Sequence, residues 1–193
     1  LMPDFILISC WLLVCYLLGT LALGDFMSQY KGIDIRSFGT MNPGATNIYR
    51  ALGLKYGISI FILDVSKGLL ATLVPIFLFD YDIHVSSLAM FSLMAGHILK
   101  SPWGKTGGTG MATTMGACCG ILPLGALISV PPSFLVLLVT KNTTYSGIFA
   151  FLFAIISGWL VQGNLIQVLS VLVAAGAVLL KYRVQYNNVS EEK

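Results

Sequence analysis

The sequence predicts an all-α polytopic membrane protein with about seven transmembrane helices, and three observations support this fold class. Of the 193 residues, 56% are apolar and only 10% are charged, whereas soluble domains carry about one quarter charged residues. Several apolar runs approach the roughly 20 residues that a helix needs to cross the hydrocarbon core. The basic residues fall almost entirely in the segments that connect alternate runs, which is typical of a protein in a cytoplasmic membrane.

The first helix is expected at residues 5–24. Asp4 is the only charge before it, so the run lacks the basic segment that precedes a signal-peptide core, and it is also too long to be one. Four further helices are expected at residues 56–79, 85–99, 145–161 and 165–180.

The apolar segment 111–139 is interrupted by Pro123 and by Pro131–Pro132. One continuous helix would be roughly 43 Å long, too long for an upright crossing, whereas two helices would each be short. If the segment crosses twice, ten basic residues share one side of the membrane: Lys31, Arg36, Arg50, Lys55, Lys100, Lys105, Lys141, Lys181, Arg183 and Lys193. The positive-inside bias therefore favours seven segments, with the N-terminus outside and the C-terminus cytoplasmic. The two short helices must then tilt or thin the bilayer locally.

The remaining segments are polar connections at residues 25–55 and 100–110 and a polar tail at 181–193. No segment indicates a separate soluble domain, so residues 1–193 are expected to form one membrane domain. The cysteines lie inside apolar runs and lack the spacing of a zinc site, which indicates packing residues and no metal: Cys10, Cys15, Cys118 and Cys119.

The first polar connection contains a loop rich in glycine and small polar side chains, closed by Arg50: Gly39-Thr40-Met41-Asn42-Pro43-Gly44-Ala45-Thr46-Asn47. Backbone N–H groups of such a loop can converge on phosphate oxygens, and an arginine supplies a planar pair of donors. The same composition also suits an ordinary turn between helices. Composition alone leaves both interpretations open.

The second polar connection ends in Gly107-Gly108-Thr109-Gly110 and runs into an apolar segment. A glycine-rich loop at a helix N-terminus favours an anion, because unpaired N–H groups and the helix dipole point toward it. The loop is not a Walker A motif, since no Gly-Lys-Ser/Thr closes it.

Asp64 and Lys67 lie one helical turn apart inside an apolar run. Charges within the membrane are costly and often functional, although a neutralised structural pair is an equal alternative. His97 ends the third apolar run, where a lone histidine is more often a cap than a catalyst.

Together these segments resemble the acyl-phosphate:glycerol-3-phosphate acyltransferase family of bacterial membranes. Its first motif corresponds to Gly32-Ile33-Asp34-Ile35-Arg36, to the loop that begins at Gly39, and to Arg50. Its Asp-x-x-Lys-Gly corresponds to Asp64, Lys67 and Gly68, and its second motif corresponds to Gly96-His97 and, nine residues later, to Gly107-Gly108-Thr109-Gly110-Met111-Ala112-Thr113. The resemblance covers nearly the whole chain.

This resemblance implies a monomeric, multi-pass enzyme of the bacterial cytoplasmic (inner) membrane. It implies transfer of a fatty acyl group from acyl phosphate to the 1-hydroxyl of glycerol 3-phosphate, giving lysophosphatidic acid in phospholipid synthesis. An acyl phosphate is an activated mixed anhydride, so no cofactor is required, and the site's work is alignment and charge stabilisation. Membrane lipid surrounds the chain, and no nucleic-acid partner is expected.

Carried over position by position, the resemblance implies catalytic and substrate-binding roles for distinct residues and no metal site. The catalytic set is Thr40, Arg50, His97 and Arg183. The substrate-binding set is Asn42, Gly44, Ala45, Thr46, Asn47, Lys67, Lys105, Gly107, Gly108, Thr109, Gly110 and Thr113.

Two departures from the family pattern keep other functions open. The lysine of the second motif is Thr109, and of the third motif, His-Arg-x-Asn-x-x-Arg-Leu, only Arg183 is retained. Lys105, four residues before Thr109, is a candidate replacement cation. The alternative to an acyltransferase is a non-catalytic or altered-specificity paralogue that binds a phosphate-bearing lipid or metabolite. A small transporter fits less well, because one intramembrane ion pair does not make a charged pathway.

Overall fold

The described part of the chain contains helices joined by loops and no strand, which confirms the predicted all-α membrane class. The computed structural model describes residues 4–99 and 107–191. The N-terminal half contains α1 (Asp4–Thr20), α2 (Leu23–Tyr30), η1 (Ile35–Ser37), α3 (Ala45–Leu52), α4 (Leu54–Phe79) and α5 (Ile83–Ile98). The C-terminal half contains α6 (Met111–Ile121), α7 (Pro123–Thr140), α8 (Thr143–Gln162) and α9 (Leu165–Glu191).

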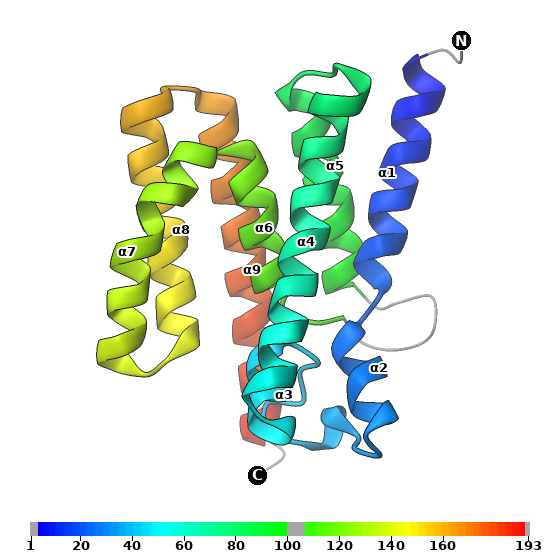
Figure 1. The fold of residues 1–193 in the computed structure, drawn as a ribbon, viewed down its shortest axis with the longest axis vertical. Coiled ribbons are helices and arrows are strands. Elements are labelled where there is room, and N and C mark those ends of the chain that lie inside the picture. The colour runs from blue at the N-terminus through cyan, green and yellow to red at the C-terminus, as the bar shows by residue number, and fades with distance from the viewer. Residues whose placement is uncertain (1–3, 100–106, 192–193) are drawn as a thin grey trace.

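The long helices run alternately up and down one bundle, and the two chain ends lie at its opposite ends (Figure 1). Five segments are long and apolar enough to cross a membrane, whereas α5 and α6 are shorter. Large apolar side chains face outward from the bundle; Phe77 and Leu160, for example, are each 76% exposed. Such a surface suits lipid rather than water.

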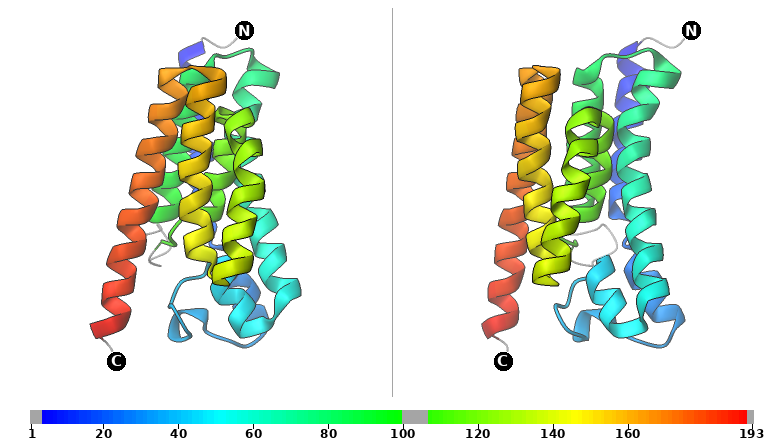
Figure 2. Two further views of the ribbon diagram at one scale, coloured as in Figure 1. Left: turned by 90° about the vertical axis from the view of Figure 1, so that its left-hand side faces the viewer. Right: turned by 60° about the vertical axis from the view of Figure 1, so that its left-hand side comes forward.

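Helices approach each other closely where glycines face a neighbour. Gly19 and Gly96 lie at the crossing of α1 and α5, and Gly68 and Gly116 lie at the crossing of α4 and α6. Small residues at such crossings are typical of membrane bundles, because they let backbones pack where no hydrophobic force drives association. The α7–α8 hairpin stands on one flank of the bundle and α1 on the other (Figures 1 and 2).

The structure corrects several expected helix bounds. The expected first helix, 5–24, breaks at Leu21–Ala22, so α1 ends at Thr20. Helix α2 begins at Leu23 and runs into the expected polar connection, which also contains η1 and α3. The segment 111–139 divides into two helices at Pro123, which is one of the expected interruptions and the first residue of α7. Pro131 and Pro132 lie inside α7 without ending it, and α9 continues through the expected polar tail to Glu191.

We call the end of the bundle that holds α2, α3 and the C-terminal part of α9 the basic end. It carries seven of the described cations: Lys31, Arg36, Arg50, Lys55, Lys141, Lys181 and Arg183. The opposite end carries carboxylates, with Tyr81 donating a hydrogen bond to Asp4 at 3.2 Å and Asp82 capping α5. This asymmetry is the one that the sequence predicts. Lys100 and Lys105 lie outside the described residues.

Candidate active site

The first glycine-rich loop is anchored by a bidentate ion pair at its start. Arg36 donates from Nε and Nη2 to the carboxylate of Asp25, with the shorter contact at 2.7 Å. Asp25 is only 2% exposed, and Asp34 accepts a hydrogen bond from the backbone N–H of Arg36. A planar two-donor contact to a buried carboxylate fixes orientation as well as distance. The pair therefore holds α2 against the segment that leads into the loop.

Asn47, an expected substrate-binding residue, shapes the loop from inside. Its Nδ2 donates to the carbonyl oxygens of Ile35 and Phe38, and its Oδ1 accepts from the N–H of Thr40 at 3.2 Å. The side chain is 2% exposed, so these bonds use most of its capacity. Asn47 thus holds the backbone of Thr40, whose side chain is exposed.

Met41 adopts a left-handed conformation with φ of 55°. For a residue with a side chain this conformation costs about 1–2 kcal/mol. The N–H of Met41 donates to the carbonyl of Phe38 at 2.9 Å, which closes the turn.

Asn42 joins the first loop to the second. Its Nδ2 donates to Oγ1 of Thr109 at 3.3 Å, and its Oδ1 accepts from the N–H of Gly44 at 3.3 Å. Gly44 precedes Ala45, the first residue of α3, so the N–H groups of this helix start lie beside the junction. Two segments 67 residues apart in the chain thus meet through residues that the sequence assigns to one site.

His97 lies at the same junction, at the end of α5. Its Nδ1 shares a 3.2 Å hydrogen bond with Oγ1 of the buried Thr113 in the first turn of α6. A Cβ placed on Gly108 would lie 2.9 Å from His97 Nε2 and 3.2 Å from Asn42 Oδ1. Glycine is therefore required for the loop to pass between the two side chains.

The second loop ends inside the bundle. Gly107 runs against the last carbonyls of α5, where any side chain would clash, and Gly110 starts α6 with φ of 78°. Helix α6 has 11 residues, about 16 Å, and begins well above the level of α3 (Figure 1). Its N-terminal N–H groups therefore face the loop junction from within the bundle.

Lys67, also an expected binding residue, is paired inside the bundle. It donates to Asp64 Oδ1 at 2.9 Å and to the carbonyl of Leu21 at 2.6 Å, and it is 6% exposed. Leu21 lies at the break between α1 and α2, where carbonyls lack a helical partner. The geometry favours the structural alternative for this ion pair.

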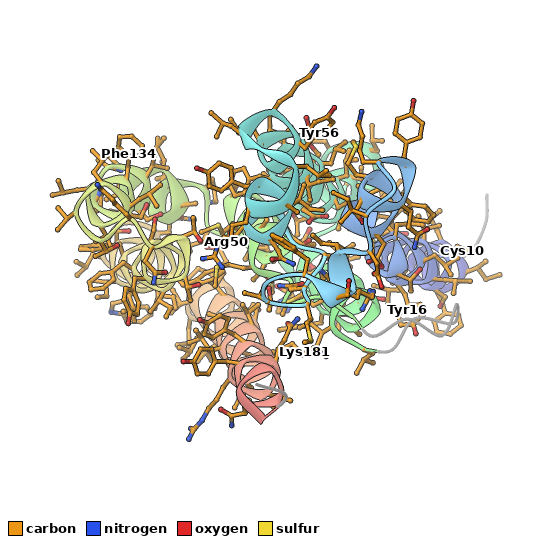
Figure 3. The ribbon with its side chains drawn as sticks, turned by 90° about the horizontal axis from the view of Figure 1, so that it is seen from below. Cys10, Tyr16, Arg50, Tyr56, Phe134 and Lys181 are labelled. Atoms are coloured by element: carbon orange, nitrogen blue, oxygen red, sulfur yellow. The ribbon has the colours of Figure 1, made fainter. Side chains whose placement is uncertain are left out.

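The expected cations of the site do not all come together. Arg50 lies in the last turn of α3 and, seen along the bundle, near its middle (Figure 3). Arg183 is exposed on α9. Two residues further on, Gln185 donates from Nε2 to the carbonyl of Thr40 at 3.3 Å. Side chains two apart on a helix point in nearly opposite directions, so Arg183 faces away from the loop, and Lys105 lies outside the described residues.

Thr46 marks a further contact of the site with a neighbouring element. Its Oγ1 lies 3.0 Å from Oγ1 of Thr143, which starts α8, so α3 and the α7–α8 hairpin are linked at the basic end.

A shallow hollow of about 440 Å³ is lined by Gln29, Gly32, Ile33, Asp34 and Arg36. It lies at the start of the first motif, apart from the loop junction.

Sequence reasoning missed the inward face of α9 and the Asp25–Arg36 pair. The expected tail made residues after 180 a polar extension, so the contact between Gln185 and Thr40 was not foreseen. The signal that could have revealed this face is the four-residue spacing of Lys181 and Gln185, because it places both side chains on one side of the helix if the helix continues past residue 180. Among the described residues, no group of three or more His, Cys, Asp or Glu side chains could hold a metal ion.

The fold and the site define an α-helical integral membrane protein in which two glycine-rich loops meet toward the basic end of the bundle. The chain belongs to the glycerol-3-phosphate acyltransferase family, whose model matches residues 9–191.

Relatives and solved structures agree with this assignment. The chain is 35% identical over 180 residues to the glycerol-3-phosphate acyltransferase of Aquifex aeolicus, covering 89% of this chain and 88% of that protein. It is 34% identical over 157 residues to that of Bacillus subtilis, covering 81% and 80%. The structure is similar to that of PlsY (YgiH), an integral membrane glycerol 3-phosphate acyltransferase, in its glycerol 3-phosphate form. The TM-score is 0.81 and the identity 28%, over 96% of this chain and 92% of that one. For the lysophosphatidic acid form of PlsY the TM-score is 0.78 and the identity 27%, with the same coverage.

Proposed function

We propose that this protein transfers a fatty acyl group from acyl phosphate to the 1-hydroxyl of glycerol 3-phosphate, giving lysophosphatidic acid. The observation that carries the proposal is the junction of Asn42, Thr109 and His97. There, two loops that suit phosphate meet in a chain that matches the acyltransferase family over residues 9–191. The matched structures include the glycerol 3-phosphate and lysophosphatidic acid forms of PlsY.

The reaction is a direct acyl transfer. The 1-hydroxyl oxygen attacks the acyl carbonyl, the bond from the carbonyl carbon to the phosphate oxygen breaks, and inorganic phosphate leaves. The hydroxyl proton goes to a phosphate oxygen, so neither a cofactor nor a covalent enzyme intermediate is needed. The protein contributes alignment and preorganised N–H and cationic groups.

In this proposal the loop residues divide into those that contact substrate and those that hold the loops. Thr40, Arg50 and the N–H groups of Ala45 and the second loop face the phosphates, while His97 and Thr113 orient the junction. Asn42 and Asn47 hold the loops in shape.

We also propose the placement that the charge pattern favours: seven crossings of a bacterial cytoplasmic membrane, the basic end in the cytoplasm, and residues 1–193 acting as one monomeric unit. In a cysteine-free background, a membrane-impermeant thiol reagent applied to intact cells should label Asp82→Cys and leave Lys55→Cys unlabelled. The reverse pattern would reject this orientation.

The alternative is a paralogue that binds a phosphate-bearing lipid or metabolite without turnover. It is favoured by Thr109, which replaces the motif lysine, and by the outward direction of Arg183, the retained residue of the third motif.

One assay separates the two functions. Purified protein in detergent is given palmitoyl phosphate, and inorganic phosphate release is followed with and without glycerol 3-phosphate. Release that requires glycerol 3-phosphate, is lost in Arg50→Ala and is retained in Gly176→Ala supports the transferase. Calorimetric binding of glycerol 3-phosphate without such release supports the paralogue.

A further inference from the structure

The replacement of the motif lysine by Thr109 leaves the second loop without a cation at that position, although two phosphates must be held nearby. Thr109 is instead tied to Asn42 through its hydroxyl. Unpaired negative charge at the margin of a membrane is costly, so a working site requires a cation from another element. The inward face of α9 offers one.

Three residues define that face, at successive turns. Val178 is fully buried in the core cluster, against which Ile98 and Met111 also pack. Gln185, seven residues later, donates to the carbonyl of Thr40 in the first loop. Lys181 lies between them, three residues after Val178 and four before Gln185, and these spacings share one face of a helix. Lys181 therefore projects toward the loop junction.

Among the described residues, Lys181 has no counterion. The side chain is half-buried, and it makes no hydrogen bond or ion pair with any of them. Its ammonium group lies within electrostatic range of the Arg36 guanidinium and of the His97 ring. Asp25, the carboxylate on that side, is engaged by Arg36. A partly buried ammonium group beside another cation favours an anionic ligand.

Two further observations concern the neighbourhood of Lys181. Oε1 of Gln185 is buried and has no hydrogen-bond partner among the described residues, so an acceptor suited to a substrate hydroxyl lies one turn from the ammonium group that would meet the phosphate. Seen from below, the labels of Arg50 and Lys181 lie nearer the middle of the bundle than those of Cys10 and Phe134 (Figure 3). The two cations come from different elements, α3 and α9.

We propose that Lys181 is a phosphate-binding residue of the site and supplies the cation that position 109 lacks. Its ammonium group donates to a phosphate oxygen of glycerol 3-phosphate or of the acyl phosphate. This inference rests on the proposed function for the identity of the substrates.

The test compares Lys181→Met, which keeps the apolar stem and removes the charge, with Lys55→Met, an exposed lysine at the start of α4. KM is measured separately for glycerol 3-phosphate and palmitoyl phosphate, and the Kd of glycerol 3-phosphate is measured by calorimetry. Lys181→Met should raise KM for one substrate about tenfold to a hundredfold, the range for a hydrogen bond to a charged group. The substrate affected identifies the phosphate bound, and Lys55→Met should change neither KM.

Charge relocation separates binding from a structural role. Thr109→Lys in the Lys181→Met background should recover most of the lost affinity, and Lys181→Arg should retain it. Rescue from a different loop cannot result from restored packing of α9.

The outcomes distinguish this inference from the proposed function. If the wild type turns over and Lys181→Met leaves both KM values within about twofold, a change of less than half a kcal/mol, the inference is wrong and the function stands. If the wild type binds glycerol 3-phosphate without turnover and Lys181→Met weakens that binding, the inference stands and the function fails. Absence of both binding and turnover in the folded wild type would overturn both.

Discussion

Thr113 and Thr114 are adjacent, fully buried threonines with different surroundings. Oγ1 of Thr113 bonds to Nδ1 of His97, whereas Oγ1 of Thr114 has no partner among the described residues. The first hydroxyl orients a ring whose other nitrogen faces Gly108. The second is a polar group buried without compensation.

Thr113→Val should lower kcat by roughly tenfold, the order expected for losing one orienting hydrogen bond, while the fold is retained. Thr114→Val is the matched control and should leave kcat unchanged with equal or higher thermal stability, because it removes an unpaired buried hydroxyl. Steady-state kinetics and melting in detergent measure both. Equal kinetic losses in the two variants would contradict a specific role for the His97–Thr113 contact.

A second prediction at the scale of single residues concerns the contribution of Arg50 to binding of glycerol 3-phosphate. Arg50 closes the first motif and makes no hydrogen bond with another described residue. Arg50→Ala should weaken glycerol 3-phosphate binding by about ten- to a hundredfold, whereas Lys55→Ala, at the membrane margin, should cost at most about 1 kcal/mol. Calorimetry measures the affinity of both variants for glycerol 3-phosphate. Equal losses of affinity would mean that Arg50 acts only through the overall positive potential of the basic end.

At the scale of elements, close helix crossings set the shape of the site. Gly68 lies against the backbone of α6 at Thr113, Gly116 and Ala117, so the α4–α6 contact directly positions the start of α6. By contrast, Gly176 in α9 has nothing within reach of an added Cβ.

Gly68→Ala should destabilise the protein by about 1–3 kcal/mol, as expected for overpacking, and should reduce activity by shifting α6. Gly176→Ala should be neutral or slightly stabilising, because alanine favours helix more than glycine does. Thermal unfolding in detergent compares the two, and an unchanged melting temperature for Gly68→Ala would show that the crossing is looser than described.

The Asp64–Lys67 pair links α4 to the break between α1 and α2. Lys67→Met leaves the carboxylate of Asp64 buried without its partner, which costs about 3–5 kcal/mol. The double variant Asp64→Asn with Lys67→Met should recover much of this loss. If the double variant folds as the wild type does yet has no activity, the pair is functional rather than structural.

Much of the helix arrangement could be predicted, because apolar length and charge bias determine membrane helices strongly. The break at Leu21 could not, since the run stays apolar through Leu23 and the carbonyl of Leu21 is bonded by Lys67, 46 residues away. The motif loops could be placed together through the family resemblance. The inward direction of Lys181 could not, because it depends on α9 continuing as a helix through a polar sequence.

At the scale of the whole molecule, the proposed function requires charge and shape to bring two substrates together. The basic end carries seven of the described cations, and the outward apolar surface of the bundle suits lipid, which would place that end at a membrane margin. A lipid-soluble acyl donor and a water-soluble phosphate acceptor can both reach such a margin. The short α6 lets the second loop enter the bundle from the basic end.

The most direct test is product formation by the purified protein in lipid vesicles supplied with palmitoyl phosphate and glycerol 3-phosphate alone. Mass spectrometry should detect lysophosphatidic acid acylated at the 1-position, with one inorganic phosphate released per product. Omitting either substrate, or using Arg50→Ala, should abolish or strongly reduce it. A folded protein that binds glycerol 3-phosphate and forms no lysophosphatidic acid under these conditions would contradict the account.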